Sequence, residues 1–329
     1  MIISRAPLRI PLGGGGTDLA SYYSEYGGFI LSAAINAYVV ITINQPRVDD
    51  SIRLKYAESE IVESVDSIRH PLFREALRHL DIHRNVEIAS LADVPAGTGL
   101  GSSGSFLVAL LNALHAMKRH HLPPAALAEE ACLIEIDRAG QPVGKHDQYI
   151  AAFGGLTCLD IDRDGTVQVT PLSISEHAVE ELRSNCLVFF TGVIRRSFDI
   201  LAQQNLSTAS RDSAVVESLH TTKQIGLDIK KALEGDDLDQ FGHLLDAHWQ
   251  NKKRRSAKIS DPGLDAIYDA AMSAGAFGGK LMGAGGGGFF LFYCPGKTKF
   301  PVRSAMRTLG LKEFFFDFDN NGARILLNV

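Results

Sequence analysis

The pattern of apolar and polar positions in the first half of the chain predicts a mixture of strands and helices. Residues 2–10 mix apolar and basic side chains and indicate a strand. Residues 29–43 form the longest apolar-rich run, which is too short to span a bilayer. We interpret this run as a buried helix end followed by a strand, because β-branched residues gather at 39–43. Shorter strands are expected at 52–56 and 86–91, and helices at 71–80 and 125–137.

One segment, residues 106–117, is apolar at nearly every position. A helix that is apolar on all sides is typical of a central, buried helix. Residues 154–169 have the pattern of a hairpin, with Asp164 and Gly165 as its turn. This first half of the chain therefore predicts a sheet packed around one central helix.

The second half begins with an expected strand at 187–191 and is mostly helical afterwards. Asp261 and Pro262 indicate a helix start, and Gly275 indicates that helix's end. No repeat, low-complexity tract or long linker separates the two halves, so we place a domain boundary near residue 185. The predicted domains are residues 1–185 and 186–329. Long helices are expected at 213–233 and 238–255, and a further strand at 289–293.

Composition narrows the class of protein without deciding its function. The 329 residues suggest about two domains, and 45% apolar with 22% charged residues is ordinary for a globular chain. The net charge of −5 and the lack of a long basic block argue against nucleic acid as a partner. The densest basic run, residues 252–255, is interpreted as a solvated helix face. The absence of a signal peptide and four widely spaced cysteines indicate a cytoplasmic protein with reduced thiols and no membrane partner.

Glycine is the unusual feature, because many of the 31 glycines gather at residues 13–16, 97–104 and 283–288. The middle cluster follows an expected strand and precedes the central helix. Such a loop presents unobstructed backbone N–H groups at a helix N-terminus, which suits a phosphate group. Three hydroxyls in it are candidates for a phosphate oxygen or a magnesium ion: Ser102, Ser103 and Ser105.

Two other phosphate-binding patterns fit this sequence poorly. Residues 99–104 satisfy G-x-G-x-x-G, but no acidic residue lies between Gly104 and Glu129, where a dinucleotide-binding unit needs one. The Walker pattern G-x-x-x-x-G-K-[ST] is absent. A simple helix cap needs only one serine and one glycine. Three clusters together therefore favour an enclosed anionic ligand.

The order of these motifs resembles that of the GHMP small-molecule kinases. The first motif is residues 5–10 with Thr17 and Asp18, the second is residues 95–103, and the third is residues 280–288. The resemblance spans nearly the whole chain. It implies an α+β fold of two domains, the first like domain 2 of ribosomal protein S5 and the second ferredoxin-like, with the active site between them.

Within that superfamily, residues 11–18, 144–149 and 248–253 look most like the D-glycero-D-manno-heptose 7-phosphate kinases. Galactokinases carry Glu-His before the Thr-Asp of the first motif, where this chain has Gly15 and Gly16. That departure argues against galactose and suggests room for a longer or phosphorylated sugar.

The resemblance also implies roles for individual residues. Asp147 matches the catalytic aspartate, and Arg9 and Lys145 are cations that steady it or stabilise the transferring phosphoryl group. Glu135 and Ser103 match the ligands of Mg²⁺. The phosphates of ATP are expected on Pro95, Gly97, Gly99, Leu100, Gly101, Ser102, Ser103, Gly104 and Ser105.

Sugar-binding residues are expected around the first and third motifs. Asp18 matches a contact to a sugar hydroxyl, and the less favoured alternative is that it caps the helix after it. A phosphate on the sugar needs its own cations, for which we select Arg195 and Arg196, with Lys252 and Lys253 as second choice. The remaining expected contacts are Gly15, Gly16, Gly285 and Gly286.

The implied reaction converts ATP and D-glycero-D-manno-heptose 7-phosphate into ADP and the 1,7-bisphosphate, a step towards nucleotide-activated heptose. A kinase for another sugar, such as fucose or galactose, stays open, as does a non-catalytic sensor of sugar and ATP. The expected partner is a small sugar phosphate, and the protein is expected to be a monomer or a homodimer.

Overall fold

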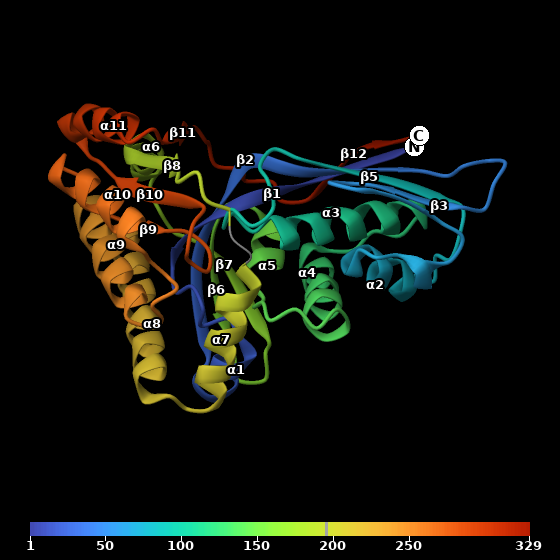
Figure 1. Cartoon of the computed structure of the whole chain (residues 1–329), viewed down its shortest axis with the longest axis horizontal. Helices are drawn as coiled ribbons and strands as arrows, with labels where there is room; N and C mark the ends of the chain where they lie inside the picture. The colour runs from blue at the N-terminus through green and yellow to red at the C-terminus, as the bar shows by residue number, and fades with distance from the viewer. Residues whose placement is uncertain (195–196) are drawn as a thin grey trace.

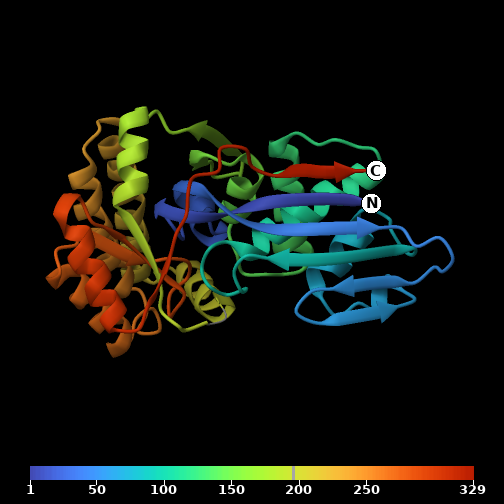
Figure 2. The same ribbon diagram turned by 90° about the horizontal axis from the view of Figure 1, so that it is seen from above.

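The computed structural model describes residues 1–194 and 197–329, and its larger layer is an eight-stranded sheet (Figures 1 and 2). Its strands are β1 (Ile2–Gly13), β2 (Gly28–Asn44), β3 (Ile52–Lys55), β4 (Ser59–Val62), β5 (Val86–Ala92), β6 (Leu156–Ile161), β7 (Val167–Pro171) and β12 (Arg324–Asn328). The strand order is β12-β1-β2-β5-β3-β4, and β6 pairs with the first half of β2 and with β7. Among the described strands, β3 and β5 alone pair in parallel.

Strand β2 corrects one expectation, because residues 29–43 contain no helix end. All residues from Gly28 to Ile35 are buried. Successive side chains of a strand point to opposite faces, so both faces of this half are covered. Helices on both sides remove the alternation of apolar and polar residues by which a strand is recognised in sequence. Helices α5 (His146–Phe153) and α8 (Ser213–Glu234) both pack against this strand.

The central helix is α3 (Ser102–Met117), which packs on β1 and β2 and confirms the buried helix expected at 106–117. The helix expected at 125–137 begins as α4 and continues as a π-helical turn, η2 (Leu133–Arg138). Such widened turns occur frequently at functional sites. The other helices of this layer are α1 (Ala20–Tyr26), α2 (Pro71–His79), α4 (Pro124–Cys132) and α6 (Glu176–Asn185), with the short turn η1 (Val65–Ser67).

The second layer is a four-stranded sheet of order β11-β8-β10-β9, covered by helices. Asp261 accepts a hydrogen bond from the Leu264 N–H, which confirms the expected helix start. The strands are β8 (Cys186–Phe190), β9 (Gly278–Leu281), β10 (Phe289–Tyr293) and β11 (Lys312–Phe314). The helices are α7 (Ser197–Ala209), α8, α9 (Leu238–Lys253), α10 (Pro262–Ser273), η3 (Gly296–Thr298) and α11 (Lys299–Thr308).

The two layers meet where α8 packs on β1 and β2. The chain ends in the first layer, since β12 pairs with β1 and the Met1 amine donates to the Val329 carbonyl at 2.6 Å (Figures 1 and 2). The boundary near residue 185 falls between α6 and β8 and stays a prediction. The arrangement confirms the expected α+β class. Over the described ranges, every helix is too short or too polar to cross a membrane.

Candidate active site

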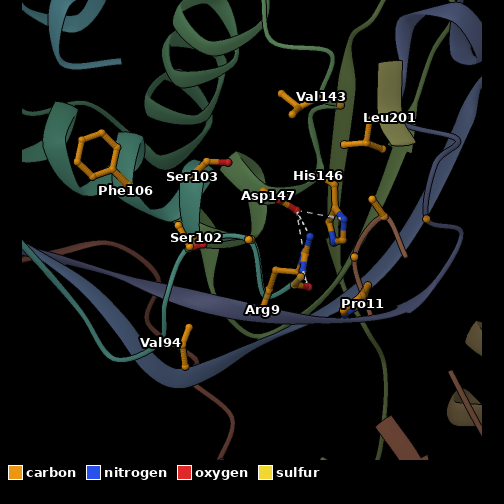
Figure 3. Close-up of a pocket in the computed structure, with 18 of the residues that line it drawn as sticks. Arg9, Pro11, Val94, Ser102, Ser103, Phe106, Val143, His146, Asp147 and Leu201 are labelled. Atoms are coloured by element: carbon orange, nitrogen blue, oxygen red, sulfur yellow. Dashed lines mark hydrogen bonds and ion pairs between the residues drawn. The ribbon is translucent and has the colours of Figure 1, made fainter. Parts of the chain in front are cut away.

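A cavity of about 790 Å³ lies between the two layers and is lined by residues of all three glycine-containing motifs. Strand β1 contributes Arg9, the N-terminus of α3 contributes Ser102 and Ser103, and α5 contributes Asp147 (Figure 3). Gly283 and Ala284, which follow β9, complete the wall from the second layer. The fold thus brings segments far apart in sequence to one site.

Asp147 and Arg9 form the central pair of this cavity (Figure 3). Arg9 Nε donates to Asp147 Oδ1 at 2.8 Å, and Arg9 Nη2 lies 2.6 Å from the same oxygen. A third bond, from Arg9 Nη1 to the Gly99 carbonyl at 2.6 Å, fixes the guanidinium. Burial acts to raise the pKa of Asp147, but the Arg9 and His146 charges outweigh it and hold that pKa below its usual value. Asp147 is therefore a carboxylate at neutral pH.

Two glycines at the start of α3 allow this close packing. A Cβ on Gly104 would lie 2.6 Å from Asp147 Cβ, and one on Gly101 would lie 3.2 Å from Asp147 Cγ. Gly101 also has φ +79°, a conformation that side chains other than glycine's rarely adopt. A larger residue at either position would push α3 away from α5 and its carboxylate.

Six residues of the expected nucleotide loop line the cavity: Pro95, Gly97, Gly99, Gly101, Ser102 and Ser103. The structure does not bring the other three there. Leu100 is buried in the core, and Gly104 packs against α5. The Ser105 hydroxyl donates to the Pro7 carbonyl at 2.7 Å, so it ties α3 to β1.

The third glycine cluster supports the loop more than it lines the cavity. A Cβ on Gly283 would lie 2.6 Å from the Gly99 Cα, so the two motifs pack backbone against backbone. Gly285 and Gly286, expected near the sugar, pack instead on the segment after α9, where the Gly286 N–H donates to the Ile259 carbonyl at 2.9 Å.

Glu135 lies on the π-helical turn and is almost fully buried. Its carboxylate accepts a hydrogen bond from Gln148 Nε2 at 2.7 Å and one from the Ser103 hydroxyl. Burial is the main cause that raises the pKa of Glu135 to about 7, and the Asp147 charge adds to it. Among the described residues, no cation forms an ion pair with this carboxylate. A buried carboxylate that lacks a counter-charge, beside a serine of the phosphate loop, is a donor set that suits a hard divalent cation.

Asp18 does not cap α1, whose N-cap is Leu19. Its carboxylate instead accepts hydrogen bonds from the Gly16 N–H at 3.1 Å and the His146 N–H at 3.2 Å. Asp18 lines the cavity together with Gly15 and Gly16, as expected for sugar contacts. Burial and the Asp147 charge raise the pKa of Asp18. The two backbone N–H groups orient the Asp18 side chain at the cavity wall, where its oxygens can meet a polar ligand.

Lys145 is not brought to Asp147. Its amine binds the Glu129 carboxylate at 2.9 Å and the Gly165 carbonyl at 2.7 Å, and it does not line the cavity. Of the two cations expected beside Asp147, the structure therefore places Arg9 there and Lys145 elsewhere. The other expected cations, Arg195 and Arg196, lie outside the described residues.

Residues 252–255 were expected to form a solvated helix face, and this was wrong. Lys252 is buried and Arg255 lines the cavity, while Arg254 is exposed. The spacing contained a signal for this: His248, Lys252 and Arg255 repeat every three or four residues and so share one helix face. Lys280, which belongs to the third motif, is buried and lines the same wall. Lys253 points elsewhere and pairs with Asp265.

Comparisons with known proteins show the family to which the chain belongs. Residues 68–155 match the model of the GHMP kinases N terminal domain and residues 229–310 that of the GHMP kinases C terminal domain. The chain is 30% identical over 318 residues to the D-glycero-alpha-D-manno-heptose 7-phosphate kinase of Campylobacter jejuni, covering 93% of each chain. The chain belongs to the GHMP kinase family.

Solved GHMP kinases share its fold over the whole length. A D-glycero-D-manno-heptose 1-phosphate kinase from Bacteroides thetaiotaomicron has a TM-score of 0.82 and 28% identity, with 100% of each chain covered. The Lactococcus lactis galactokinase bound to galactose has a TM-score of 0.76 over 98% of this chain and 94% of its own. At 18% identity, that second likeness concerns the fold alone.

Membership of the family gives the class of reaction. GHMP kinases are phosphotransferases with an alcohol acceptor, and a kinase of this family uses ATP. The N-terminal match includes the glycine loop, Glu135 and Asp147, and the C-terminal match includes Lys252, Arg255 and Lys280. Arg9 and Asp18 lie outside both matches and belong to the site by geometry.

Proposed function

We propose that this GHMP kinase transfers the γ-phosphoryl group of ATP to the anomeric hydroxyl of D-glycero-D-manno-heptose 7-phosphate, giving the 1,7-bisphosphate and ADP. The observation that carries the proposal is the ionised Asp147 beside the glycine loop, in a cavity that is also lined by the cations Arg9, Lys252, Arg255 and Lys280. The names of the Campylobacter jejuni and Bacteroides relatives also support an acceptor of the heptose kind. Those two names place the phosphate at opposite ends of the sugar, so the acceptor has to be measured.

The nucleotide is assigned to the end of the cavity formed by β5 and α3. Apolar and aromatic residues line this end: Val39, Tyr56, His70, Leu72, Val94 and Phe106. His70 packs between Tyr56 and Phe106, with ring centroids 4.9 and 5.3 Å away, which gives a flat base its apolar surroundings. The phosphates then follow the loop from Gly97 to Ser103, where backbone N–H groups and the dipole of α3 favour negative charge.

Asp147 is the proposed base. Its carboxylate accepts the proton of the attacking hydroxyl as the oxygen–phosphorus bond forms, and the bond to the leaving ADP oxygen breaks in line. Arg9 orients this carboxylate and presents positive charge to the transferring group. Asp18, held by the Gly16 and His146 N–H groups, accepts a hydrogen bond from a hydroxyl of the sugar. Both carboxylates thus face the acceptor.

Ser103 and Glu135 are the residues that would hold Mg²⁺. When bound, the ion neutralises charge on the nucleotide phosphates. The Ser103 hydroxyl now donates to Glu135, and its oxygen keeps a lone pair for a ligand position. The donor set is small, as is usual for magnesium, which fills its other positions with phosphate and water.

Glu135→Gln is expected to weaken the response to magnesium. It removes the negative charge with little change of shape, so we expect kcat at low Mg²⁺ to fall by about 10–100-fold, with partial recovery at high Mg²⁺. A titration of activity against Mg²⁺ measures this. The exposed carboxylate of Asp137, two residues along, provides the matched control, Asp137→Asn. An unchanged magnesium dependence would contradict the assignment.

The pH dependence of thermal stability provides a second measurement on Glu135→Gln that does not depend on activity. The pKa of Glu135 is raised in the folded protein from 4.5 to about 7, so the folded state binds more protons than the unfolded state between those values. In metal-free buffer, wild-type protein should therefore lose stability as the pH rises through this window. Thermal unfolding of Glu135→Gln should lack that component. Parallel curves for both proteins would show that Glu135 is not an isolated buried carboxylate.

The proposed function is tested by ADP release with Mg-ATP across a panel of acceptors: heptose 7-phosphate, heptose, mannose, galactose, fucose and mevalonate. Turnover confined to the 7-phosphate supports the proposal. Equal turnover of unphosphorylated sugars would instead leave a kinase for another sugar, such as fucose or galactose. If no acceptor causes ADP release although the protein still binds ATP, a sensor is favoured and the proposal is overturned.

A further inference from the structure

Three basic side chains at the end of α9 and on β9 form what we call the cation cluster: Lys252, Arg255 and Lys280. All three line the cavity. Within the described part of the chain, none of them forms an ion pair with a carboxylate. Buried cations are normally paired. Beside them, the almost fully buried His248 has an Nδ1 atom that lacks a hydrogen-bond partner in the structure.

The charges of the cation cluster favour the binding of an anion. Burial, together with the Arg255 and Arg9 charges, lowers the pKa of Lys280 to about 7. Burial likewise lowers the pKa of Lys252 well below its usual value, and that of Arg255 to about 10. Of the two aspartates that line the cavity, Asp147 is already paired with Arg9, and Asp18 accepts hydrogen bonds from the Gly16 and His146 N–H groups. A bound anion would therefore offset both the desolvation and the mutual repulsion of the cluster.

The three cations have different surroundings. The Lys252 amine donates to the Leu281 and Gly283 carbonyls at 3.0 and 2.6 Å, so it supports the third motif beside the nucleotide loop. Lys280 is only weakly held, with the Leu12 carbonyl and His248 Nε2 each 3.5 Å from its amine. It therefore keeps hydrogen-bonding capacity for a ligand.

Arg255 is held by residues of α8 and of the first glycine cluster. Its Nε donates to the Ser218 hydroxyl at 3.0 Å, Nη1 is 3.4 Å from the Gly15 carbonyl, and Nη2 donates to Thr222. Those partners belong to α8 and to the first glycine cluster, and among the described residues Arg255 has no hydrogen bond with residues 97–103. ATP phosphates bound on residues 97–103 would therefore not pair with Arg255, which has no carboxylate partner among the described residues.

We propose that Arg255, with Lys280 beside it, binds a phosphate group already carried by the acceptor, and so selects a phosphorylated sugar. This inference rests on the proposed function, because it needs an acceptor whose reacting hydroxyl lies at Asp147. A guanidinium matches the oxygens of a phosphate group and favours it over a neutral hydroxyl. Gly15 and Gly16 bear no side chains that would block the space next to Arg255.

The test compares two acceptors, D-glycero-D-manno-heptose 7-phosphate and the same heptose without phosphate, on wild type and Arg255→Gln. We expect the KM for the 7-phosphate to rise about 10–100-fold, as for loss of a charge-assisted hydrogen bond. The KM for ATP should change less than about threefold, and kcat/KM for the unphosphorylated heptose, already low in wild type, should not fall further, because this acceptor has no phosphate for Arg255 to contact. The matched control is Arg254→Gln, which removes the exposed neighbouring guanidinium and should change neither. An equal loss with both acceptors would overturn the inference.

A second measurement covers the case in which Arg255→Gln fails to fold or no acceptor is turned over. Arg255→Lys keeps the charge but loses the paired donors of the guanidinium. With the nucleotide site saturated by Mg-ADP, inorganic phosphate should raise the Tm of wild type and of Arg254→Gln, and raise that of Arg255→Lys less. A wild type that phosphate does not stabilise would contradict the anion site. If phosphate stabilises but no sugar is phosphorylated, the site stands and the proposed function fails.

Discussion

Replacing Asp147 with asparagine is expected to lower kcat by about 10²–10⁴-fold, the usual contribution of a positioned general base. The substitution keeps the size of the side chain and removes the oxygen that accepts the proton. The glycine loop and Asp18 remain in place, so the KM for ATP and the KM for the acceptor should change little. Single-turnover ADP formation, with nucleotide binding measured separately, distinguishes the loss of chemistry from the loss of binding.

The Tm of Asp147→Asn and the activity of a control variant test whether Asp147 is the general base. Arg9 loses its paired carboxylate in Asp147→Asn, so a lower Tm is expected because a buried guanidinium is left without its partner. The exposed Asp137 gives the control Asp137→Asn, which should retain both activity and Tm. If Asp147→Asn keeps kcat within about tenfold of wild type, less than a general base normally supplies, Asp147 is not the base.

The parts of this site that could be predicted from sequence are those that depend on backbone geometry. A Cβ on Gly104 would lie 2.6 Å from Asp147 Cβ, and Gly101 combines φ +79° with contacts of 3.1–3.2 Å to Arg9 and Asp147, so both positions favour glycine. Asp147 and Arg9 were found through the motifs that surround them. Their mutual contact connects residues 138 positions apart, and only the folded chain makes it visible.

The sequence predictions that were wrong are those that depend on which face of a helix or strand is buried by other elements. The first half of β2 looks helical in sequence because both of its faces are buried. Residues 252–255 look like a solvated face because basic residues are usually exposed, yet α9 directs Lys252 into the cavity. Lys145 is the opposite case, since it is close to Asp147 in sequence and its amine is bound by Glu129. Local patterns do not contain this information, which depends on packing between distant elements.

Replacing Arg9 with methionine is expected to lower kcat at neutral pH by about 10²–10³-fold, the magnitude seen when a donor to the developing charge is removed. Methionine retains an apolar stem and removes the guanidinium. Two consequences follow, because Arg9 both faces the transferring phosphoryl group and holds the pKa of Asp147 below its usual value. Arg9→Lys, which keeps the charge, should recover part of the activity.

The pH profile separates these two consequences. In wild type the pKa of Asp147 is lowered, so the base is ionised at neutral pH and its protonation limits kcat only in acid. Without Arg9 burial dominates, the pKa of Asp147 rises above its usual value, and kcat should fall at a higher pH than in wild type as the solution is acidified. Arg5→Met, on the same strand and outside the cavity, should keep the wild-type profile. If Arg9→Met loses activity by the same factor at every pH, Arg9 acts on the phosphoryl group alone. A shifted acid limb, with partial recovery at high pH, would mean that Arg9 also keeps the base ionised.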